Sequence, residues 1–384
     1  MDFELTESQK ELKSEITEFA KTHLNIDAAN RDNEQLFSHE LWHACSLHKL
    51  HGLMVPEEFG GRGLTPLDMC IVLEALATGC SDGGLVFSIG AHLLAVTYPT
   101  WQYGTAKQRS NWLPKLCNGS FIGANAISEQ QSGSDVYQMN VTATSFRNGY
   151  RINGRKVFIS NAPVSDYILV YVSTDKEKGF FGGISAFMVS SKALGVHIDE
   201  RLDKIGVRTC QAANISFIDV FVTEDDCIGK IGGGGRIFAD AINWERVGLS
   251  ACHLGTMNRI FERLTKHVKN RKSAGQSLAS YQAISHKLVD QKIQLEAARL
   301  LVYKAASTLN KKVVATPNAS IAKVFVSDLF VSSTIETIQL LGSSGLLTSD
   351  ETNRALRDAI GSTIYSGTNL IQKNIIASSL GFQR

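Results

Sequence analysis

One carboxylate, Glu245, lies in a segment whose spacing places it on an apolar face of an expected helix. Within Asn243–Leu249 and the residues just before it, helical spacing groups Glu245 with Ala241, Ile242 and Leu249. Burial raises the pKa of a carboxyl group, and a glutamate with a raised pKa can act as a general base near neutral pH. From this segment alone, a structural ion pair with Arg246 or with another basic side chain is the simpler interpretation.

A second group of polar residues occurs in the loop Ala126–Asp135. It combines hydroxyls, a glycine and carboxylates between two β-like segments, as loops that line a ligand site often do. The same residue types are common in surface turns, so composition alone favours a turn. In the following stretch, Tyr150–Asn161, the pair Asn153-Gly154 predicts a hairpin turn, and the next strand ends in Phe158 and Ser160.

The segment His39–His43 offers a different chemistry. It matches the pattern H-E-x-x-H, which on a helix holds zinc between two imidazoles with the glutamate as base. Only three residues of the pattern are fixed and no third ligand can be identified, so we interpret it as a chance match on a surface helix. No metal site is predicted. Cys210 is interpreted as a structural residue rather than a nucleophile.

The elements that must position these groups follow a helical, β, helical order. Apolar residues recur at three- and four-residue spacing over 5–118, short β-rich runs separated by turns occupy 121–231, and helical periodicity returns afterwards. We predict three domains: 1–120, helical; 121–231, β; and 232–384, helical. The four glycines at 232–235 lack a following Lys-Ser/Thr, so they are interpreted as a hinge rather than a nucleotide-binding loop.

Composition excludes several classes of function. The 384 residues carry 39 Lys plus Arg against 37 Asp plus Glu, and this balance favours neither nucleic acid nor an anionic membrane as partner. No signal peptide and no transmembrane segment are predicted. The 7 cysteines are widely spaced, without a Cys-x-x-Cys pair, which indicates reduced thiols in a cytoplasmic protein.

Taken together, the motifs resemble the acyl-CoA dehydrogenase family over essentially the whole chain. The matching segments, in the order of the family, are Asp2–Thr6, Val55–Gly61, Ala126–Asp135, Tyr150–Asn161, Lys204–Thr209, Arg271 with Gly275, Gln282, Gln339–Gly342, Arg357-Asp358 and Tyr365–Thr368. The resemblance implies an α+β fold with an N-terminal helical domain, a middle β-barrel-like domain and a C-terminal four-helix bundle. It also implies FAD as the cofactor.

The resemblance assigns cofactor-binding roles to two groups of residues. Those matching the flavin and pyrophosphate contacts of the family, or its cover over the flavin ring, are Ile127, Ser128, Ser134, Phe158, Ser160 and Thr368. Those matching the contacts to the adenosine diphosphate half, which the family makes across a subunit interface, are Arg271, Gln282, Gln339 and Gly342. A homodimer or homotetramer is therefore implied.

The sequence departs from the family at the usual catalytic base. The resemblance predicts Tyr-Glu-Gly-Thr near the end, whereas this chain has Ser366 at the glutamate position, and a serine hydroxyl cannot be that base. The isovaleryl-CoA and long-chain branches carry their base on the first bundle helix, at the position of Glu245. We therefore predict Glu245 as the catalytic base and the backbone N–H of Ser366 as a donor to the developing enolate oxygen.

Further departures bear on substrate and cofactor. Ala274 replaces a phenylalanine, Phe158 an often-found tryptophan, and Ser343 a glycine of the family. Trp244 and Arg246 flank the predicted base and are the predicted substrate-binding residues. Together with Asn125, which stands where relatives often have an aromatic residue, Trp244 suggests a short acyl pocket.

The predicted function is FAD-dependent α,β-dehydrogenation of an acyl thioester carried by CoA or by an acyl carrier protein, as in secondary-metabolite biosynthesis. The electron acceptor would be an electron-transfer flavoprotein or another acceptor. Two alternatives stay open: an oxidase or monooxygenase on the same fold, and a scaffold that binds flavin or carrier without catalysis. The departures at Ser366 and Ala274 motivate the second alternative.

Overall fold

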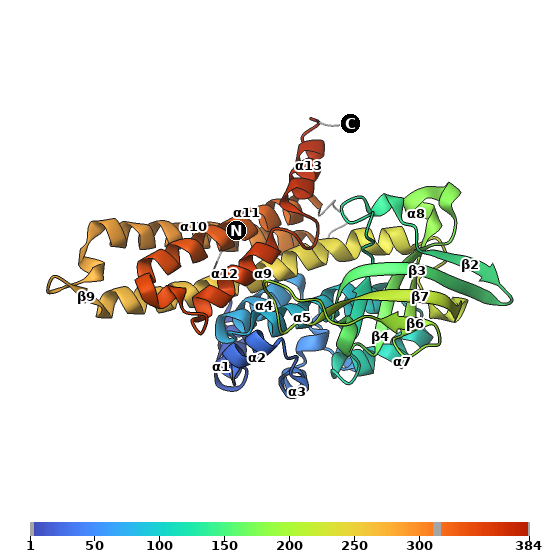
Figure 1. The fold of residues 1–384 in the computed structure, drawn as a ribbon, viewed down its shortest axis with the longest axis horizontal. Helices are drawn as coiled ribbons and strands as arrows, with labels where there is room; N and C mark the ends of the chain where they lie inside the picture. The colour runs from blue at the N-terminus through green and yellow to red at the C-terminus, as the bar shows by residue number, and fades with distance from the viewer. Residues whose placement is uncertain (1–3, 310–315, 383–384) are drawn as a thin grey trace.

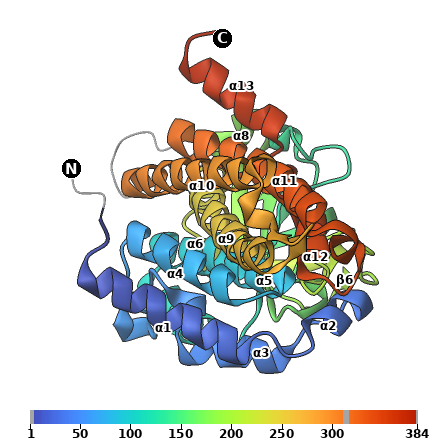
Figure 2. The ribbon, with the colours of Figure 1, turned by 90° about the vertical axis from the view of Figure 1, so that its left-hand side faces the viewer.

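The computed structural model describes residues 4–309 and 316–382. Three regions follow each other along the chain, as the sequence pattern predicts: helices, a curled sheet, and a second set of long helices (Figure 1). Viewed end-on, the N-terminal helices lie beneath the long C-terminal helices, and helix α13 projects away from both (Figure 2).

The first region is helical, and its helices begin where capping residues predict. Thr6 and Thr105 each form a capping box with a glutamine three residues later, and Thr65 caps a helix whose first residue is Pro66. The helices are α1 (Glu7–His23), α2 (Ala28–Glu34), α3 (His39–Leu47), α4 (Pro66–Gly79), α5 (Gly83–His92), α6 (Tyr98–Tyr103) and α7 (Ala106–Cys117). A π-helical turn, Leu93–Thr97, joins α5 to α6.

The second region is an eight-stranded sheet with its own apolar core. Its strands are β1 (Gly123–Ala126), β2 (Thr142–Phe146), β3 (Gly149–Ser160), β4 (Tyr167–Ser173), β5 (Ile184–Ser190), β6 (Val196–Ile198), β7 (Ala212–Thr223) and β8 (Cys227–Ile228), with the short helix α8 (Gly179–Gly183) before β5. The hydrogen-bonded order is β6-β7-β3-β2-β4-β5-β8, and β1 pairs in parallel with β4.

The predicted hairpin at Asn153-Gly154 is wrong. These residues lie inside β3, at a register shift against β7, and Gly154 has a φ of 135°. The side chain of Asn153 exchanges hydrogen bonds with Asp219 on β7, so the pair forms a bulge rather than a turn. The turn between β2 and β3 instead lies just before Gly149, which pairs with Phe146.

The third region contains α9 (Gly234–Asn270), α10 (Gln282–Leu309), α11 (Thr316–Leu341), α12 (Glu351–Ser362) and α13 (Asn369–Ser379). A two-stranded hairpin, β9 (Lys272–Ser273) and β10 (Gln276–Ser277), lies at the far end of α9 from the sheet (Figure 1). Helix α9 also packs against α4, so one core joins the two helical regions.

The glycine tract at 232–235, predicted as a hinge, leads directly into α9. Gly234 and Gly235 form the first turn of α9, and a Cβ atom on Gly235 would lie 2.2 Å from the carbonyl oxygen of Phe180. A Cβ on Gly234 would lie 2.7 Å from the carbonyl carbon of Ser185. The glycines therefore let the start of α9 pack directly on the backbone of α8 and β5.

One stretch, Thr316–Leu346, has the length and apolar composition of a membrane span. Most of it is α11, which packs against α9, α10, α12 and α13. Its buried side chains include the charged Lys323, whose ammonium group donates to Asn369. We assign α11 as a core helix of the bundle.

Candidate active site

The carboxylate of Glu245 meets the turn that precedes α13. The hydroxyl of Ser366 donates a hydrogen bond to Glu245 Oε1 at 2.5 Å, across 121 residues of sequence. Burial raises the pKa of Glu245, while the hydrogen bond from Ser366 and the positive charge of Arg246 partly oppose that rise. The structure thus places together the two residues predicted to be catalytic.

The turn Tyr365–Thr368 is held in one conformation. Ser366 has a φ of 57°, in the left-handed region, and Gly367 follows with a φ of 85°. The carbonyl oxygen of Ser366 accepts from Arg246 Nε at 3.1 Å and from Gln372 Nε2 at 3.3 Å, and Thr368 caps α13. No described residue accepts a hydrogen bond from the backbone N–H of Ser366. This N–H can therefore donate to a ligand.

The two predicted substrate-binding residues have supporting positions. Arg246 is 7% exposed, and its guanidinium group donates hydrogen bonds to the carbonyl oxygen of Ser366 and to Asn243 Oδ1. Trp244 is 2% exposed, and its ring stacks on Tyr98 at 4.3 Å between centroids. The substrate-binding role of Trp244 stays a prediction.

The predicted flavin-binding loop is attached to β3 by a buried ion pair that sequence reasoning missed. Lys156 Nζ lies 2.8 Å from Glu129 Oε1 and also donates to the carbonyl of Ile127 at 2.9 Å. Glu129 in turn accepts from the backbone N–H of Asn140 and Val141. Burial lowers the pKa of Lys156 to about 8, although Glu129 opposes that shift.

The attached loop brings several predicted cofactor residues to one end of the molecule. The carbonyl oxygen of Ser128 accepts a hydrogen bond from the backbone N–H of Val157. This bond places the loop beside the end of β3, where Phe158 and Ser160 lie. Phe158 has a φ of 58° and is 71% exposed, so its ring has no cover from the described residues. Ser134 is also exposed.

The residues predicted to bind the adenosine diphosphate half lie at the opposite end. Arg271 follows α9, Gln282 begins α10, and Gln339 and Gly342 lie at the end of α11; all four are exposed. An apolar cluster that includes Leu264, Val268 and Leu341 packs these helix ends together. They form one surface beside β9, remote from the sheet (Figure 1).

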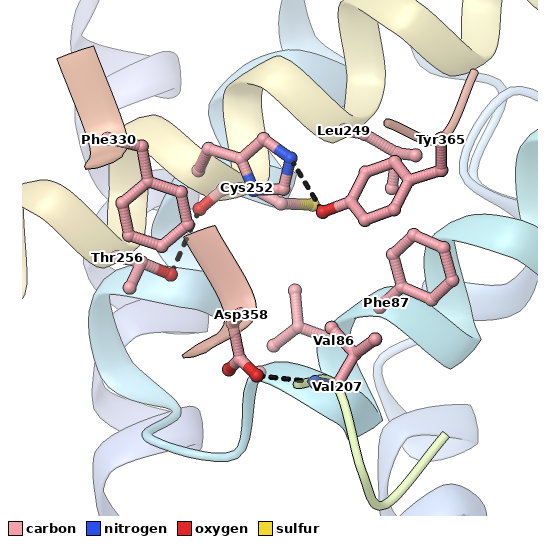
Figure 3. Close-up of a pocket in the computed structure, with 11 residues that line it drawn as sticks. Val86, Phe87, Val207, Leu249, Cys252, Thr256, Phe330, Asp358 and Tyr365 are labelled. Carbon is pink, nitrogen blue, oxygen red and sulfur yellow. Dashed lines mark hydrogen bonds between the residues drawn. The ribbon is translucent and has the colours of Figure 1, made fainter. Parts of the chain in front are cut away.

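A cavity lies beneath the Ser366 turn, between α5, α9, α11 and α12 (Figure 3). Rings of Phe87 and Tyr365, 4.6 Å apart, form one wall, and the Tyr365 hydroxyl lies 3.1 Å from His253 Nε2. Burial lowers the pKa of His253 to about 3 and raises that of Asp358 to about 6. Glu245 does not line this cavity.

A tyrosine–carboxylate cluster lies before Glu245 on α9 and was also missed. The hydroxyls of Tyr98 and Tyr103 donate to Asp240 Oδ2 at 2.7 and 2.8 Å. Tyr171 on β4 faces the same helix, and its ring contacts Phe238. Burial is the main cause that raises the pKa of Tyr171, followed by the negative charge of Glu245 and the nearby Tyr103 and Asp240.

The other sequence motifs show no site. Within the described ranges, no group of three or more His, Cys, Asp or Glu side chains could hold a metal ion, and His39 and His43 lie on α3. All seven cysteines, Cys210 included, are buried and unpaired. Burial is the main cause that raises the pKa of Cys210, which favours its neutral thiol.

A carboxylate beside a backbone N–H without a partner among the described residues is an arrangement that can remove a proton next to a carbonyl group and stabilise the resulting oxyanion. Family models narrow the class of enzyme. The acyl-CoA dehydrogenase N-terminal domain matches residues 6–120, the middle domain 124–220 and the C-terminal domain 232–381. The chain belongs to the acyl-CoA dehydrogenase family of oxidoreductases.

Individual relatives agree with the family models. The chain is 35% identical over 383 residues to an L-prolyl-[peptidyl-carrier protein] dehydrogenase of Serratia sp., with 100% of this chain and 99% of the relative covered. Among solved structures, PigA with FAD and proline has a TM-score of 0.96 at 35% identity, with both chains covered to 100%. The prolyl acyl carrier protein oxidase AnaB has a TM-score of 0.96 at 33% identity, covering 98% of this chain and 100% of AnaB.

Proposed function

We propose that this enzyme catalyses FAD-dependent α,β-dehydrogenation of an acyl thioester, with Glu245 as the base. The observation that carries the proposal is the contact between Glu245 and Ser366, because it joins a carboxylate of raised pKa to the turn that presents an unpaired backbone N–H. FAD, when bound, accepts the hydride that leaves the β-carbon.

The residues at the sheet end fit a flavin. Asn125 Oδ1 on β1 and Ser132 Oγ in the following loop are buried without a hydrogen-bond partner among the described residues, so they are polar atoms that a ligand can satisfy. The exposed ring of Phe158, at the end of β3, offers a flat apolar surface. We propose Ile127, Ser128, Ser134, Phe158, Ser160 and Thr368 as the residues that hold the flavin half.

Glu245 and Ser366 divide the work at the substrate. Glu245 removes the α-proton, and its raised pKa brings its basicity closer to that of the reaction it must assist. The backbone N–H of Ser366 donates to the thioester oxygen as negative charge grows there. A serine provides this N–H as well as a glutamate would, so the carboxylate can reside on α9 while the turn keeps its donor.

We propose a prolyl group on a carrier protein as the substrate. Relatives named for that substrate are 35% identical, compared with 32% for a short-chain specific acyl-CoA dehydrogenase of Rattus norvegicus. A CoA thioester remains the alternative, because both carriers present the same pantetheine arm.

We propose that at least two chains complete each cofactor site. The Ser366 turn and Thr368 lie beside Glu245, whereas the residues for the adenosine diphosphate half lie beyond the end of α9; the 25 residues from Glu245 to Asn270 at 1.5 Å each give about 38 Å. One dinucleotide cannot extend over that length, so Arg271, Gln282, Gln339 and Gly342 would serve a partner chain. Exposed apolar side chains on α10 and α11, such as Ile293, Leu300 and Phe325, give such a partner a surface.

The electron acceptor and the location of the protein are also proposals. An electron-transfer flavoprotein would reoxidise a dehydrogenase, whereas the name of AnaB favours molecular oxygen as a second candidate. Oxygen consumption measured with and without an added acceptor distinguishes them. A cytoplasmic location is consistent with seven unpaired cysteines.

An anaerobic titration tests the function directly. The purified protein is expected to carry an oxidised flavin absorption band that L-prolyl-carrier protein bleaches. Glu245→Gln should retain the band and lose the bleaching, while Glu262→Gln, an exposed site on the same helix, should behave as wild type. Bleaching by no acyl thioester at all would contradict the proposal, and so would full bleaching of Glu245→Gln.

A further inference from the structure

Helix α13 buries a polar side chain at the place where a helix that packs on a bundle usually buries apolar ones. Of the described α13 residues only Gln372 is buried, whereas the apolar Leu370 on the same helix is exposed. The rest of α13 projects away from the bundle (Figure 2). Taking an amide group out of water costs free energy unless its donors and acceptor find partners. The burial of Gln372 therefore indicates partners that require this side chain.

Both polar atoms of this amide group are hydrogen-bonded. The hydroxyl of Ser320 on α11 donates to Gln372 Oε1 at 2.8 Å. Gln372 Nε2 donates to the carbonyl oxygens of Ser366 and Gly367, at 3.3 and 3.1 Å. These contacts connect α11, through α13, to the turn that carries the proposed donor to the thioester oxygen.

The turn itself is shaped to accept the glutamine. A Cβ atom on Gly367 would lie 2.6 Å from Gln372 Nε2, and the φ of 85° at Gly367 is one that glycine adopts readily. Arg246 Nε donates to the same Ser366 carbonyl from α9, at 3.1 Å. Donors from two helices therefore hold this carbonyl, and the φ of 57° at Ser366 couples its direction to that of the N–H of the same residue.

A polar stripe on α11 holds the start of α13 at a second point. Ser320, Lys323 and Ser327 follow one another at helical spacing, and all three are buried. Lys323 and Ser327 both donate to Asn369 Oδ1, at 2.6 and 3.0 Å. Because Asn369 attaches α13 independently of Gln372, the glutamine can be changed while the helix keeps its place.

We propose that Gln372, itself oriented by Ser320, is a positioning residue for the oxyanion donor of the active site. Gln372 holds the Ser366 carbonyl and thereby directs the backbone N–H of Ser366 toward the thioester oxygen. A donor that is fixed in advance stabilises a developing oxyanion best, because it needs no reorientation during the reaction. The inference rests on the proposed function, since it concerns the enolate that forms when Glu245 removes the α-proton.

Hydrogen exchange of an acetyl thioester isolates this step. Acetyl-pantetheine has α-protons but no β-carbon, so no hydride can leave it. In D₂O the carboxylate of Glu245 takes an α-proton, exchanges it with solvent and returns deuterium to the enolate carbon. Mass spectrometry of the thioester measures the deuterium that the FAD-loaded protein incorporates.

Replacing the glutamine should slow this exchange. Gln372→Met keeps the length of the side chain but removes both hydrogen bonds to the turn. We expect exchange about 10- to 100-fold slower than in wild type, because a small displacement of a reacting group has an effect of that size. Asn374→Met, at an exposed amide on the same helix, is the matched control and should behave as wild type.

A second variant distinguishes positioning from folding. Ser320→Ala leaves the glutamine in place but removes the donor to its Oε1, and should slow exchange about 3- to 10-fold. The double variant should be no slower than Gln372→Met alone, because Ser320 acts through Gln372. Should Gln372→Met fail to fold, Ser320→Ala decides the question by itself.

Two failures remain distinguishable. Absence of exchange by wild type would contradict Glu245 as the base, and with it the proposed function. Exchange by wild type that both single variants leave unchanged would overturn the role of Gln372 alone. Urea unfolding completes the test, since a variant that loses stability but exchanges like wild type would make Gln372 a purely structural residue.

Discussion

The two ends of helix α9 differ in how fully their polar groups are paired within one chain. Toward the sheet, Glu245, Arg246 and the Ser366 turn bond to one another, and Lys156 and Glu129 fix the neighbouring loop. Beyond the other end, no described residue pairs with the side chain of Arg271 or Gln282, and both are exposed. The comparison shows polar groups paired within the chain at one end, and at the other end exposed polar groups that a ligand or another chain could pair with.

The largest effect should come from removing the base at the organised end. Glu245→Gln keeps the shape and the bond to Ser366 but cannot accept a proton. We expect kcat to fall about 10²- to 10⁴-fold with FAD content unchanged. Stopped-flow reduction of the flavin measures this directly, and a loss smaller than tenfold would assign the base to another group.

Breaking the ion pair beside the flavin loop should weaken the fold itself. Lys156→Met leaves Glu129 buried without its partner, which costs about 3–5 kcal/mol of unfolding free energy. The double variant Lys156→Met/Glu129→Gln should recover part of that loss, because no charge remains buried. Urea unfolding of the three proteins provides the measurement; equal stability of the single and double variants would contradict the coupling.

A complementation assay tests whether Arg271, which follows the end of α9, serves the cofactor site of a partner chain. Arg271→Ala should lose FAD binding, and Glu245→Gln should lose catalysis, so each protein alone is nearly inactive. If Arg271 serves the partner's site, random mixing of both chains into dimers should restore about one quarter of wild-type activity. Dissociated and reassembled mixtures, checked by size-exclusion chromatography, allow this assay. Absence of restoration in verified mixed dimers would place Arg271 in its own chain's site.

A smaller effect should follow from changing the hydroxyl that contacts Glu245. Ser366→Ala retains the backbone N–H but removes a hydrogen bond that lowers the pKa of Glu245. The pKa should therefore rise further, and because the base acts when deprotonated, activity should be lost at higher pH than in wild type. We expect kcat/KM near the acid limb to drop about 3- to 10-fold.

The profile of kcat/KM against pH checks that prediction, with Ser362→Ala as the control. Ser362 is buried near the same turn but donates to the carbonyl of Ala359 rather than to Glu245. An unchanged acid limb in Ser366→Ala would mean that the hydroxyl does not tune the base.

The sequence predicts the order of elements well because local periodicity determines it. Helices α9, α10 and α11 lie after the sheet, where helical periodicity returns, and strands β1 to β8 lie within the β-rich stretch 121–231. The position of Glu245 on an apolar face is likewise visible in one segment. Its partner Ser366 comes from the family resemblance, since 121 residues separate the two.

Other features could not be predicted because long-range contacts create them. Tyr98 meets Asp240 over 142 residues, and Glu129 meets Lys156 from a loop of ordinary polar composition. The failed hairpin at Asn153-Gly154 has the same origin, because pairing with β7 overrides the local turn preference. The buried position of Trp244 depends on its stacking on Tyr98, which no local pattern indicates.

The continuous length of α9 has a mechanical consequence. In the proposed assembly, helix α9 carries Glu245, the base of one active site. The far end of the same helix extends toward the cofactor of the neighbouring active site. The start of α9 packs through Gly234 and Gly235 directly on the backbone of β5 and α8. No side chain lies between these backbones to adjust its rotamer when the helix moves. Binding of FAD at one active site would shift α9 as a rigid body. This shift would reorient Glu245 at the other active site. Flavin uptake by the empty protein should therefore be cooperative between subunits.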